Sequence, residues 1–285
     1  MAIVHEFKYF KAKSIKEAVS LLSKHKNAAL LAGGTDLVCE LKDQAASPSA
    51  LIDIKGIETL QGITLTGKQL KIGALVTFTD LILSDVVKEQ FPLLAEMAKT
   101  VASVAIRNRA TVVGNICSAV PCMDSAPVLY VYDASIHVIG PSGKREIPIS
   151  QWFKNVRKTA IKKDEIVTHI SIPLPTHKHA GCFAKLGRYA GEDLAQANVA
   201  VLVLQNNRYR VSFGSVAPVP IRAKKIEKAL NGKPVDEKTI KIAQELLLQE
   251  IKPITDIRAT KEYRMHMCKV MLERSLKTAV ERLEL

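Results

Sequence analysis

The sequence predicts a protein of mixed α and β structure in two parts, a larger part up to about residue 176 and a smaller α+β part after it. Apolar runs of strand length alternate with amphipathic runs of helical length. The segment 173–179, with Pro173 and Pro175, interrupts this pattern and is the predicted linker. At 285 residues with 47% hydrophobic composition, the chain is long enough for one large domain or two modest ones.

The larger part is predicted to begin with a capped helix. Ser14 and Glu17 have the spacing of a capping box, and apolar residues follow at helical spacing, so a helix is expected over about 15–24. The spacing of apolar residues and the turn residues between them predict the further elements. Strands are expected at 28–31, 51–54, 70–76 and 166–172, and a hairpin is expected from 135–139 and 144–147. One helix is expected to start over 79–83, and a helical pattern continues over 93–104.

The smaller part is predicted to contain a hairpin followed by helices. Apolar runs at 198–204 and 208–213 flank Asn206-Asn207, a typical hairpin turn. Helices are expected at 221–230, which Gly232 would terminate, at 239–250, and over 260–283.

Two glycine-containing segments are the strongest indication of a ligand site. The first, 31–37, follows a predicted strand, and the second, 110–116, follows a predicted helix. Glycine lets backbone N–H groups converge on an anion with no Cβ in the way, so the two segments are expected to form a two-sided phosphate cradle. Taken alone, the pair Gly33-Gly34 is more typical of a tight turn than of a ligand site.

The composition argues against several other classes. The net charge of +13 permits nucleic-acid binding, but the basic residues are scattered among acids and aromatic residues make up only 5%, so no nucleic acid is expected. An anionic ligand or acidic partner subunits explain the charge equally well. No apolar stretch of spanning length and no signal peptide is recognisable, so we expect no membrane span and a cytoplasmic location.

The five cysteines predict neither a disulfide framework nor a metal site. Their number is odd and no C-x-x-C pair occurs, which favours reduced thiols. Cys117 and Cys122 follow the second glycine segment, where contact with a ligand is possible, but a direct chemical role is not expected because reactive thiols need a positively polarised site.

Several segments carry a family resemblance because they occur together and in order. They are Ala32–Leu37, Ile72–Ala74, Arg107–Ile116, Pro121–Pro127, Phe183–Arg188 with Asp193–Ala195, Gly214–Ala223, and Asp256–Ala259 with Glu262–Arg264. In this order they resemble the FAD-binding medium subunit of the molybdenum hydroxylases, the xanthine dehydrogenase and carbon monoxide dehydrogenase family.

The resemblance implies a fold, a cofactor and partners. It implies an FAD-binding domain of the vanillyl-alcohol oxidase (PCMH) type over residues 1–176 and a domain like the CO dehydrogenase flavoprotein C-terminal domain over residues 177–285. The implied partners are a small subunit with [2Fe-2S] clusters and a large subunit with the molybdopterin cofactor. The chain would then pass electrons from those clusters through FAD to an acceptor such as NAD, with the molybdenum chemistry on another chain.

The resemblance also implies the site residues. The pyrophosphate and ribityl chain would be bound by Leu30, Leu31, Ala32, Gly33, Gly34, Thr35, Asp36, Leu37, Thr111, Gly114 and Asn115. Ser118 would add a hydroxyl, Asp124 would accept hydrogen bonds from FAD hydroxyls, and Ile161 and Ile166 would pack on the ring system. Lys185 would be the catalytic cation near the flavin ring, where it stabilises negative charge on reduction; the alternative is a surface lysine.

Two departures from the family pattern leave alternatives open. Val113, a β-branched residue, stands where the family usually has a glycine, so pyrophosphate binding at this position is expected to be looser or differently turned. Tyr189 replaces a second basic residue, and its ring is a candidate for stacking near the flavin or the acceptor. The competing interpretations are a stand-alone FAD-dependent oxidoreductase of the vanillyl-alcohol oxidase superfamily and a flavin-free binding or assembly protein.

Overall fold

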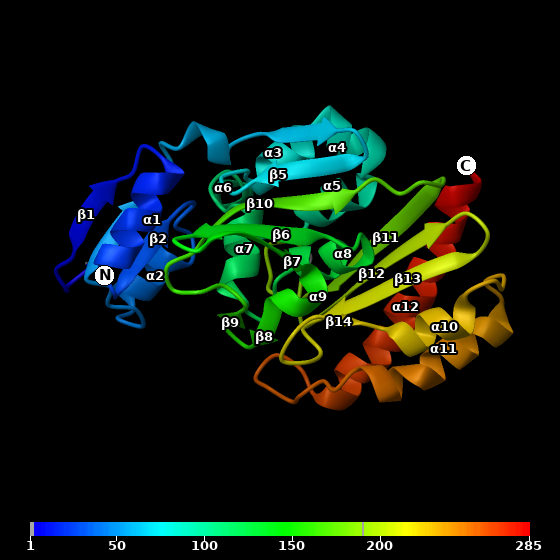
Figure 1. Cartoon of the computed structure of the whole chain (residues 1–285). Coiled ribbons are helices and arrows are strands. Elements are labelled where there is room, and N and C mark those ends of the chain that lie inside the picture. The colour runs from blue at the N-terminus through cyan, green and yellow to red at the C-terminus, as the bar shows by residue number, and fades with distance from the viewer. Residues whose placement is uncertain (1–2, 190) are drawn as a thin grey trace.

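The computed structural model describes residues 3–189 and 191–285, and its N-terminal segment forms a small parallel sheet at one end of the molecule (blue in Figure 1). The strand order is β1-β3-β2. The elements are β1 (Lys8–Lys11), α1 (Ile15–Lys24), β2 (Ala28–Leu31), α2 (Leu37–Lys42) and β3 (Ala50–Asp53).

Helix α1 has the predicted bounds, and its start shows how the sequence sets them. The Ser14 hydroxyl accepts the N–H of Glu17, which satisfies one donor of the first turn. The Glu17 carboxylate accepts the N–H of Lys13 rather than that of Ser14, so the reciprocal half of the capping box is displaced by one residue.

The middle of the molecule is a five-stranded antiparallel sheet with a group of short helices (cyan to green in Figure 1). The strand order is β4-β5-β10-β6-β7. The strands are β4 (Ile63–Thr66), β5 (Gln69–Gly73), β6 (Ser135–Gly140), β7 (Gly143–Pro148) and β10 (Ile166–Pro173), with a separate pair β8 (Phe153–Asn155) and β9 (Lys158–Thr159). The helices are the 3-10 turn η1 (Glu58–Leu60), α3 (Phe78–Leu83), α4 (Asp85–Gln90), α5 (Pro92–Lys99), α6 (Val104–Arg107), α7 (Val112–Ser118), α8 (Ser125–Val131) and α9 (Ile149–Trp152).

The prediction of a helical segment over 93–104 is wrong at its C-terminal end. Helix α5 ends at Lys99, Ala102 adopts a left-handed φ of 38°, and Ser103 caps a new helix, α6, by accepting the N–H of Ile106. A serine inside an apolar run favours a new N-terminus because its hydroxyl competes for backbone donors. The break places α6 beside the second glycine segment.

The C-terminal segment is a four-stranded sheet covered by helices (yellow to red in Figure 1). The strands β11 (His179–Leu186), β12 (Ala197–Leu204), β13 (Arg208–Gly214) and β14 (Ile221–Arg222) pair in sequence order, and the helices are α10 (Lys224–Leu230), α11 (Glu237–Glu250) and α12 (Lys261–Glu284). Asn206 and Asn207 both have left-handed φ values, 64° and 53°, as the predicted hairpin turn requires. The helix expected from 221 begins at Lys224, because Ile221 and Arg222 pair with β13.

Two hydrophobic cores meet at the strand β12, all of whose residues are buried. Ala200, Leu202 and Leu204 belong to the core of the larger part, whereas Val199, Val201 and Val203 belong to the core under α10, α11 and α12. Alternate side chains of a strand point to opposite faces, so one strand joins the two cores. The division at residues 176 and 177 stays a prediction. Over residues 3–189 and 191–285, no helix is long and apolar enough to cross a membrane.

Candidate functional site

A cavity of about 480 Å³ collects most of the predicted site residues. The predicted residues that line it are Leu30, Ala32, Gly33, Gly34, Thr35, Asp36, Leu37, Thr111, Gly114, Asn115, Ser118, Asp124 and Lys185. They come from the N-terminal sheet, from α7 and the turn before α8, and from β11. Three parts of the chain far apart in sequence therefore share one cavity.

The first glycine segment presents backbone donors at this cavity. Among the residues that the structure describes, no hydrogen-bond acceptor meets the N–H groups of residues 33–36. The carbonyls of Gly34 and Asp36 accept N–H groups of α2, and Gly34 has a left-handed φ of 78°. Consecutive open amides in such a turn form a concave anion-binding nest.

Gly33 is required by a contact with the second segment. A Cβ at this position would lie 2.1 Å from the carbonyl oxygen of Arg109 and 3.2 Å from the Cα of Ala110. The two glycine segments therefore touch through their backbones, which no side chain at position 33 permits.

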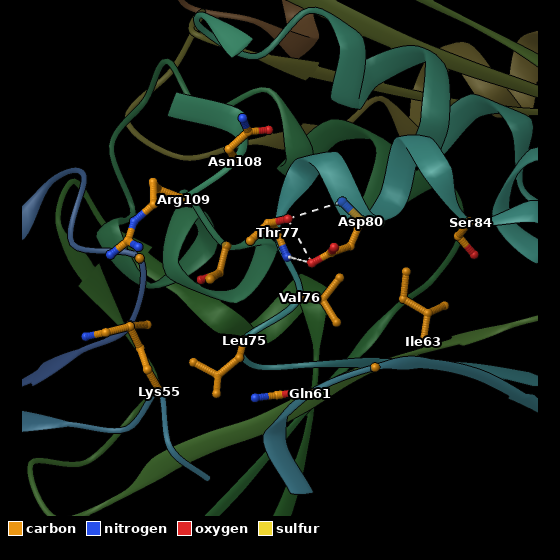
Figure 2. A pocket seen from close by; sticks show the side chains of 14 residues that line it. Lys55, Gln61, Ile63, Leu75, Val76, Thr77, Asp80, Ser84, Asn108 and Arg109 are labelled. Atoms are coloured by element: carbon orange, nitrogen blue, oxygen red, sulfur yellow. Dashed lines mark hydrogen bonds between the residues drawn. The ribbon is translucent and has the colours of Figure 1, made fainter. Parts of the chain in front are cut away.

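A second cavity of about 450 Å³ is also lined by Gly33 and Arg109 (Figure 2). Only three predicted residues reach it: Ala32, Gly33 and Thr111. Two of its charged side chains already have partners, since Asp80 accepts the hydroxyl of Thr77 at 2.8 Å and Lys55 pairs with Asp53 at 2.8 Å. The 480 Å³ cavity is therefore the candidate site.

The second glycine segment does not supply the amides that were expected of Gly114 and Asn115. It forms helix α7, in which the N–H of Gly114 donates to the Thr111 hydroxyl at 2.9 Å and the N–H of Asn115 donates to the Thr111 carbonyl at 3.0 Å. A Cβ at Gly114 would lie 2.7 Å from the Thr111 hydroxyl oxygen, so this glycine makes room for the helix cap. The prediction of amides converging from both sides is wrong for these two groups.

Val113 lies in the core and not in the cavity. Its side chain is 5% exposed and packs in the core of the larger part, while its neighbours Thr111, Gly114 and Asn115 line the cavity. In a helix, successive side chains point in different directions, so the branched side chain faces away from the ligand space. The side chain of Val113 therefore does not enter the cavity, and a looser or differently turned pyrophosphate site at this position stays a prediction.

Two side-chain contacts join residues of the cavity lining, one made by Asp36 at the N-cap of α2 and one by Glu40 within α2. The Ser118 hydroxyl donates to the Asp36 carboxylate, and Arg157 pairs with Glu40. All four residues line the cavity. Glu40 and Arg157 carry no motif that marks them in the sequence, because 117 positions separate them.

A buried ion pair lies at another part of the cavity lining. Lys185 donates to Asp124 at 2.7 Å and to the Thr100 carbonyl at 2.9 Å, and its side chain is only 11% exposed, so the alternative of a surface lysine is wrong. Asp124 also accepts the side-chain N–H of Asn198 at 2.9 Å. Burial raises the pKa of the Asp124 carboxyl, while the charge of Lys185 opposes that shift.

The loop after β11 forms part of the rim. Asp193 lines the cavity, accepts the N–H of Leu194 at 2.8 Å, and its pKa is lowered by a hydrogen bond from the N–H of Arg188. Leu194 also lines the cavity and is 49% exposed. Tyr189 is 58% exposed and does not line the cavity, so its stacking stays a prediction.

Three predicted residues lie outside the cavity lining. Ile166 is 1% exposed in the core of the larger part, and Ile161 packs against that core. Leu31 directs its side chain toward Gly34, where a Cβ would lie 3.1 Å from the Leu31 Cδ1 atom. Their contacts with a cofactor stay predictions.

A cavity lined by an open amide nest is the form expected of a protein that binds a dinucleotide or another diphosphate. Residues 5–175 match the family described as the FAD binding domain in molybdopterin dehydrogenase, and residues 182–279 match the CO dehydrogenase flavoprotein C-terminal domain. The chain belongs to this family of FAD-binding medium subunits of molybdenum hydroxylases and is an oxidoreductase subunit.

Relatives and solved structures agree with this assignment over nearly the whole chain. The chain is 32% identical over 280 residues to the xanthine dehydrogenase FAD-binding subunit of Escherichia coli O157:H7, covering 95% of each protein. It is 32% identical over 278 residues to the carbon monoxide dehydrogenase medium chain of Hydrogenophaga pseudoflava, covering 96% of each. A solved carbon monoxide dehydrogenase from that organism has a TM-score of 0.95, 33% identity and 99% coverage of both chains. The fold class expected from the resemblance is confirmed.

Proposed function

We propose that the 480 Å³ cavity holds FAD and that the chain passes electrons from the [2Fe-2S] clusters of a partner subunit through FAD to an acceptor such as NAD. The observation that carries the proposal is the row of open amides at residues 33–36, because a diphosphate needs donors of this kind and a close backbone approach. The cavity therefore fits the cofactor of the family.

The residues of the chain have separate roles in this proposal. The amides of residues 33–36 bind the diphosphate, and Thr111 and Asn115 line the facing wall. Lys185 supplies a fixed cation, held by Asp124, beside the reactive end of the cofactor. When bound, FAD supplies a redox centre that accepts and releases electrons.

The proposed partners are a small [2Fe-2S] subunit and a large molybdopterin subunit. The relatives described as medium chains belong to enzymes of several chains. Apolar side chains stand exposed near the cavity, Val104 at 62% and Ile106 at 38% on α6, and the net charge of +13 favours acidic partner surfaces.

The proposed acceptor is an anionic dinucleotide such as NAD. A cavity of about 270 Å³ shares Cys122 with the FAD cavity and is lined by the basic residues Lys252, Arg258 and Arg264. A cytoplasmic location is also proposed, since all five cysteines are unpaired thiols.

The first test is the absorption spectrum of the purified chain, followed by acid release of the cofactor. We expect a flavin spectrum and one FAD per chain. A chain that stays colourless after incubation with FAD would contradict the proposal and favour a binding or assembly protein. Turnover of an organic substrate by the chain alone would instead indicate a stand-alone oxidoreductase.

The second test adds the partner subunits. Reduced [2Fe-2S] subunit is mixed with the flavin-loaded chain without oxygen, and bleaching of the flavin band is followed before and after NAD is added. We expect bleaching by the partner and recovery with NAD. Bleaching without recovery would exclude NAD and leave the first half of the electron path intact.

A further inference from the structure

Asn198 is a buried polar residue at the edge of the candidate site, and no motif marks it. It lies in β12 with 0% exposure, and its side-chain N–H donates to Asp124 at 2.9 Å. In the β11–β12 ladder Asn198 is the direct register partner of Lys185. Directly paired residues project from the same face of a sheet, so Lys185 and Asn198 approach Asp124 from neighbouring strands.

The strand on the other side of β12 makes room for this asparagine. Gly214 in β13 is the register partner of Asn198, and a Cβ at Gly214 would lie 2.4 Å from the Asn198 Oδ1 atom. The row Lys185, Asn198 and Gly214 therefore runs across three strands on one face. In this row Lys185 and Asn198 both donate to the Asp124 carboxylate, and Gly214 leaves space for the Asn198 side chain.

The orientation of the Asn198 amide depends on the charge of Asp124. The Nδ2 atom faces two acceptors, the Asp124 carboxylate at 2.9 Å and the Met123 carbonyl at 3.4 Å, while Oδ1 is buried without a hydrogen-bond partner among the described residues. A flipped amide would place its oxygen against both acceptors. A buried acceptor without a partner costs free energy. The amide nevertheless leaves its Oδ1 atom without a partner, because the opposite orientation would remove the donor from Asp124.

Each oxygen of Asp124 thus has one dedicated donor. Oδ2 accepts a hydrogen bond from Lys185, and Oδ1 accepts one from Asn198. Asp124 as a whole is only 5% exposed. Burial favours the protonated form of a carboxyl, and donors to both oxygens favour the charged form. If Asp124 took up a proton, Lys185 would lose its counter-charge and one of its two anchors.

We propose that Asn198 is a positioning residue that keeps Asp124 ionised and thereby fixes the place and the net charge of Lys185 beside the flavin. This inference rests on the proposed function, because it assigns to Lys185 a bound flavin to act on. Asn198 itself does not line the cavity. It acts only through Asp124.

The test compares Asn198→Leu with Ser212→Ala in the full chain. Ser212 is also 0% exposed in the same sheet, but its hydroxyl donates to the Ile221 carbonyl and it does not line the cavity. The first measurement is chemical unfolding of the flavin-free chain from pH 5 to pH 8. The titratable groups near Asp124 are Lys185 from β11 and Cys122 from the turn before α8, with Asp193 on the same cavity.

The sign of the expected effect follows from the raised pKa of Asp124. A carboxyl that holds its proton more tightly in the folded state stabilises that state at low pH and loses this contribution as pH rises toward the folded pKa. Removing the Asn198 donor takes away a hydrogen bond that favours the charged carboxylate, so it raises the pKa of Asp124 further. The instability of Asn198→Leu relative to the wild type should therefore grow with pH, while that of Ser212→Ala stays constant.

The second measurement is the reduction potential of bound FAD over the same pH range. In Asn198→Leu, the potential should rise above that of the wild type as pH falls, because protonation of Asp124 leaves the charge of Lys185 uncompensated, and should approach the wild-type value as pH rises. In Ser212→Ala it should follow the wild type. If Asn198→Leu does not fold, Asn198→Asp replaces it, since a protonated aspartate still donates to Asp124 at low pH; its stability should match the wild type near pH 5 and fall as pH rises.

The outcomes separate the two proposals. A wild-type chain that takes up no FAD contradicts the proposed function, whatever the variants do. A wild-type chain that binds FAD, together with an Asn198→Leu variant whose stability and potential differ from the wild type by the same amount at every pH, overturns the role of Asn198 alone.

Discussion

The two glycine segments look alike in sequence, but they have different structures. Residues 33–36 form a loop whose N–H groups have no acceptor among the described residues, whereas Gly114 and Asn115 lie in a helix that uses theirs. The reason for each glycine also differs. At Gly33 a Cβ would strike the Arg109 carbonyl, at Gly34 the backbone is left-handed, and at Gly114 a Cβ would strike the Thr111 hydroxyl.

The comparison shows that a glycine pattern reports where a Cβ is excluded and not which atom excludes it. In this chain the excluding atoms are the protein's own at Gly33 and Gly114. Only the first segment leaves its donors open for an anion. Substitutions in the two segments should therefore affect stability and FAD affinity in different proportions.

The largest effect is expected for Gly33→Ala. The new Cβ would lie 2.1 Å from a backbone oxygen, which no change of rotamer relieves, so the two segments must separate. We expect a loss of about 3 kcal/mol or more in the free energy of unfolding, at the upper end for overpacked sites. Denaturant unfolding and FAD titration measure the two effects, and a variant with wild-type stability and affinity would contradict the close contact.

Val113→Gly should reduce stability without tightening FAD binding. The variant loses a buried valine side chain and gains a glycine inside α7, so we expect about 2–3 kcal/mol of destabilisation. Because the Val113 side chain faces the core, the dissociation constant of FAD should not improve. Tighter binding in the variant would support the interpretation in which Val113 loosens the binding of the pyrophosphate.

Gly34→Ala should lower the affinity for FAD strongly, although it lowers the free energy of unfolding only modestly. A residue other than glycine at a φ of 78° costs about 1–2 kcal/mol, and the Cβ would also press on Leu31. Relief of that strain changes the direction of the neighbouring amides. Calorimetric FAD titration beside denaturant unfolding of the same samples tests this, and an unchanged dissociation constant would show that these amides do not bind the diphosphate.

The smallest effect is expected for Thr111→Ala. The variant removes the side-chain cap of α7, which is worth about 1 kcal/mol. Because the second segment is proposed to shape the cavity wall rather than to donate amides, FAD affinity should fall less than in Gly34→Ala. A larger fall than in Gly34→Ala, measured by the same titration, would reverse the assignment of the two segments.

The sequence predicts well those features that depend on neighbouring residues. The Ser14 hydroxyl reaches a donor three residues away, and the Asn206-Asn207 turn needs only its own backbone, so α1 and the β12–β13 hairpin follow from local patterns. The family resemblance of the ordered motifs also predicts 13 of the 27 residues that line the cavity.

Features that depend on distant contacts are not predictable in this way. Asn198 meets Asp124 across 74 positions, and Gly33 is required by Arg109, so neither contact leaves a local pattern. The direction of the Val113 side chain depends on α7 being a helix, whereas the glycine in this segment is a signal typical of a turn. Residues acting through such contacts are found only when the strands and helices are placed together.

The most direct test of the central claim is hydrogen exchange at single amides of the chain with and without FAD. The amides of residues 33–36 should exchange quickly in the free chain and become protected when FAD binds, while those of Gly114 and Asn115 should be protected in both states. Bound FAD together with unchanged, fast exchange at residues 33–36 would contradict the proposal that this loop holds the diphosphate.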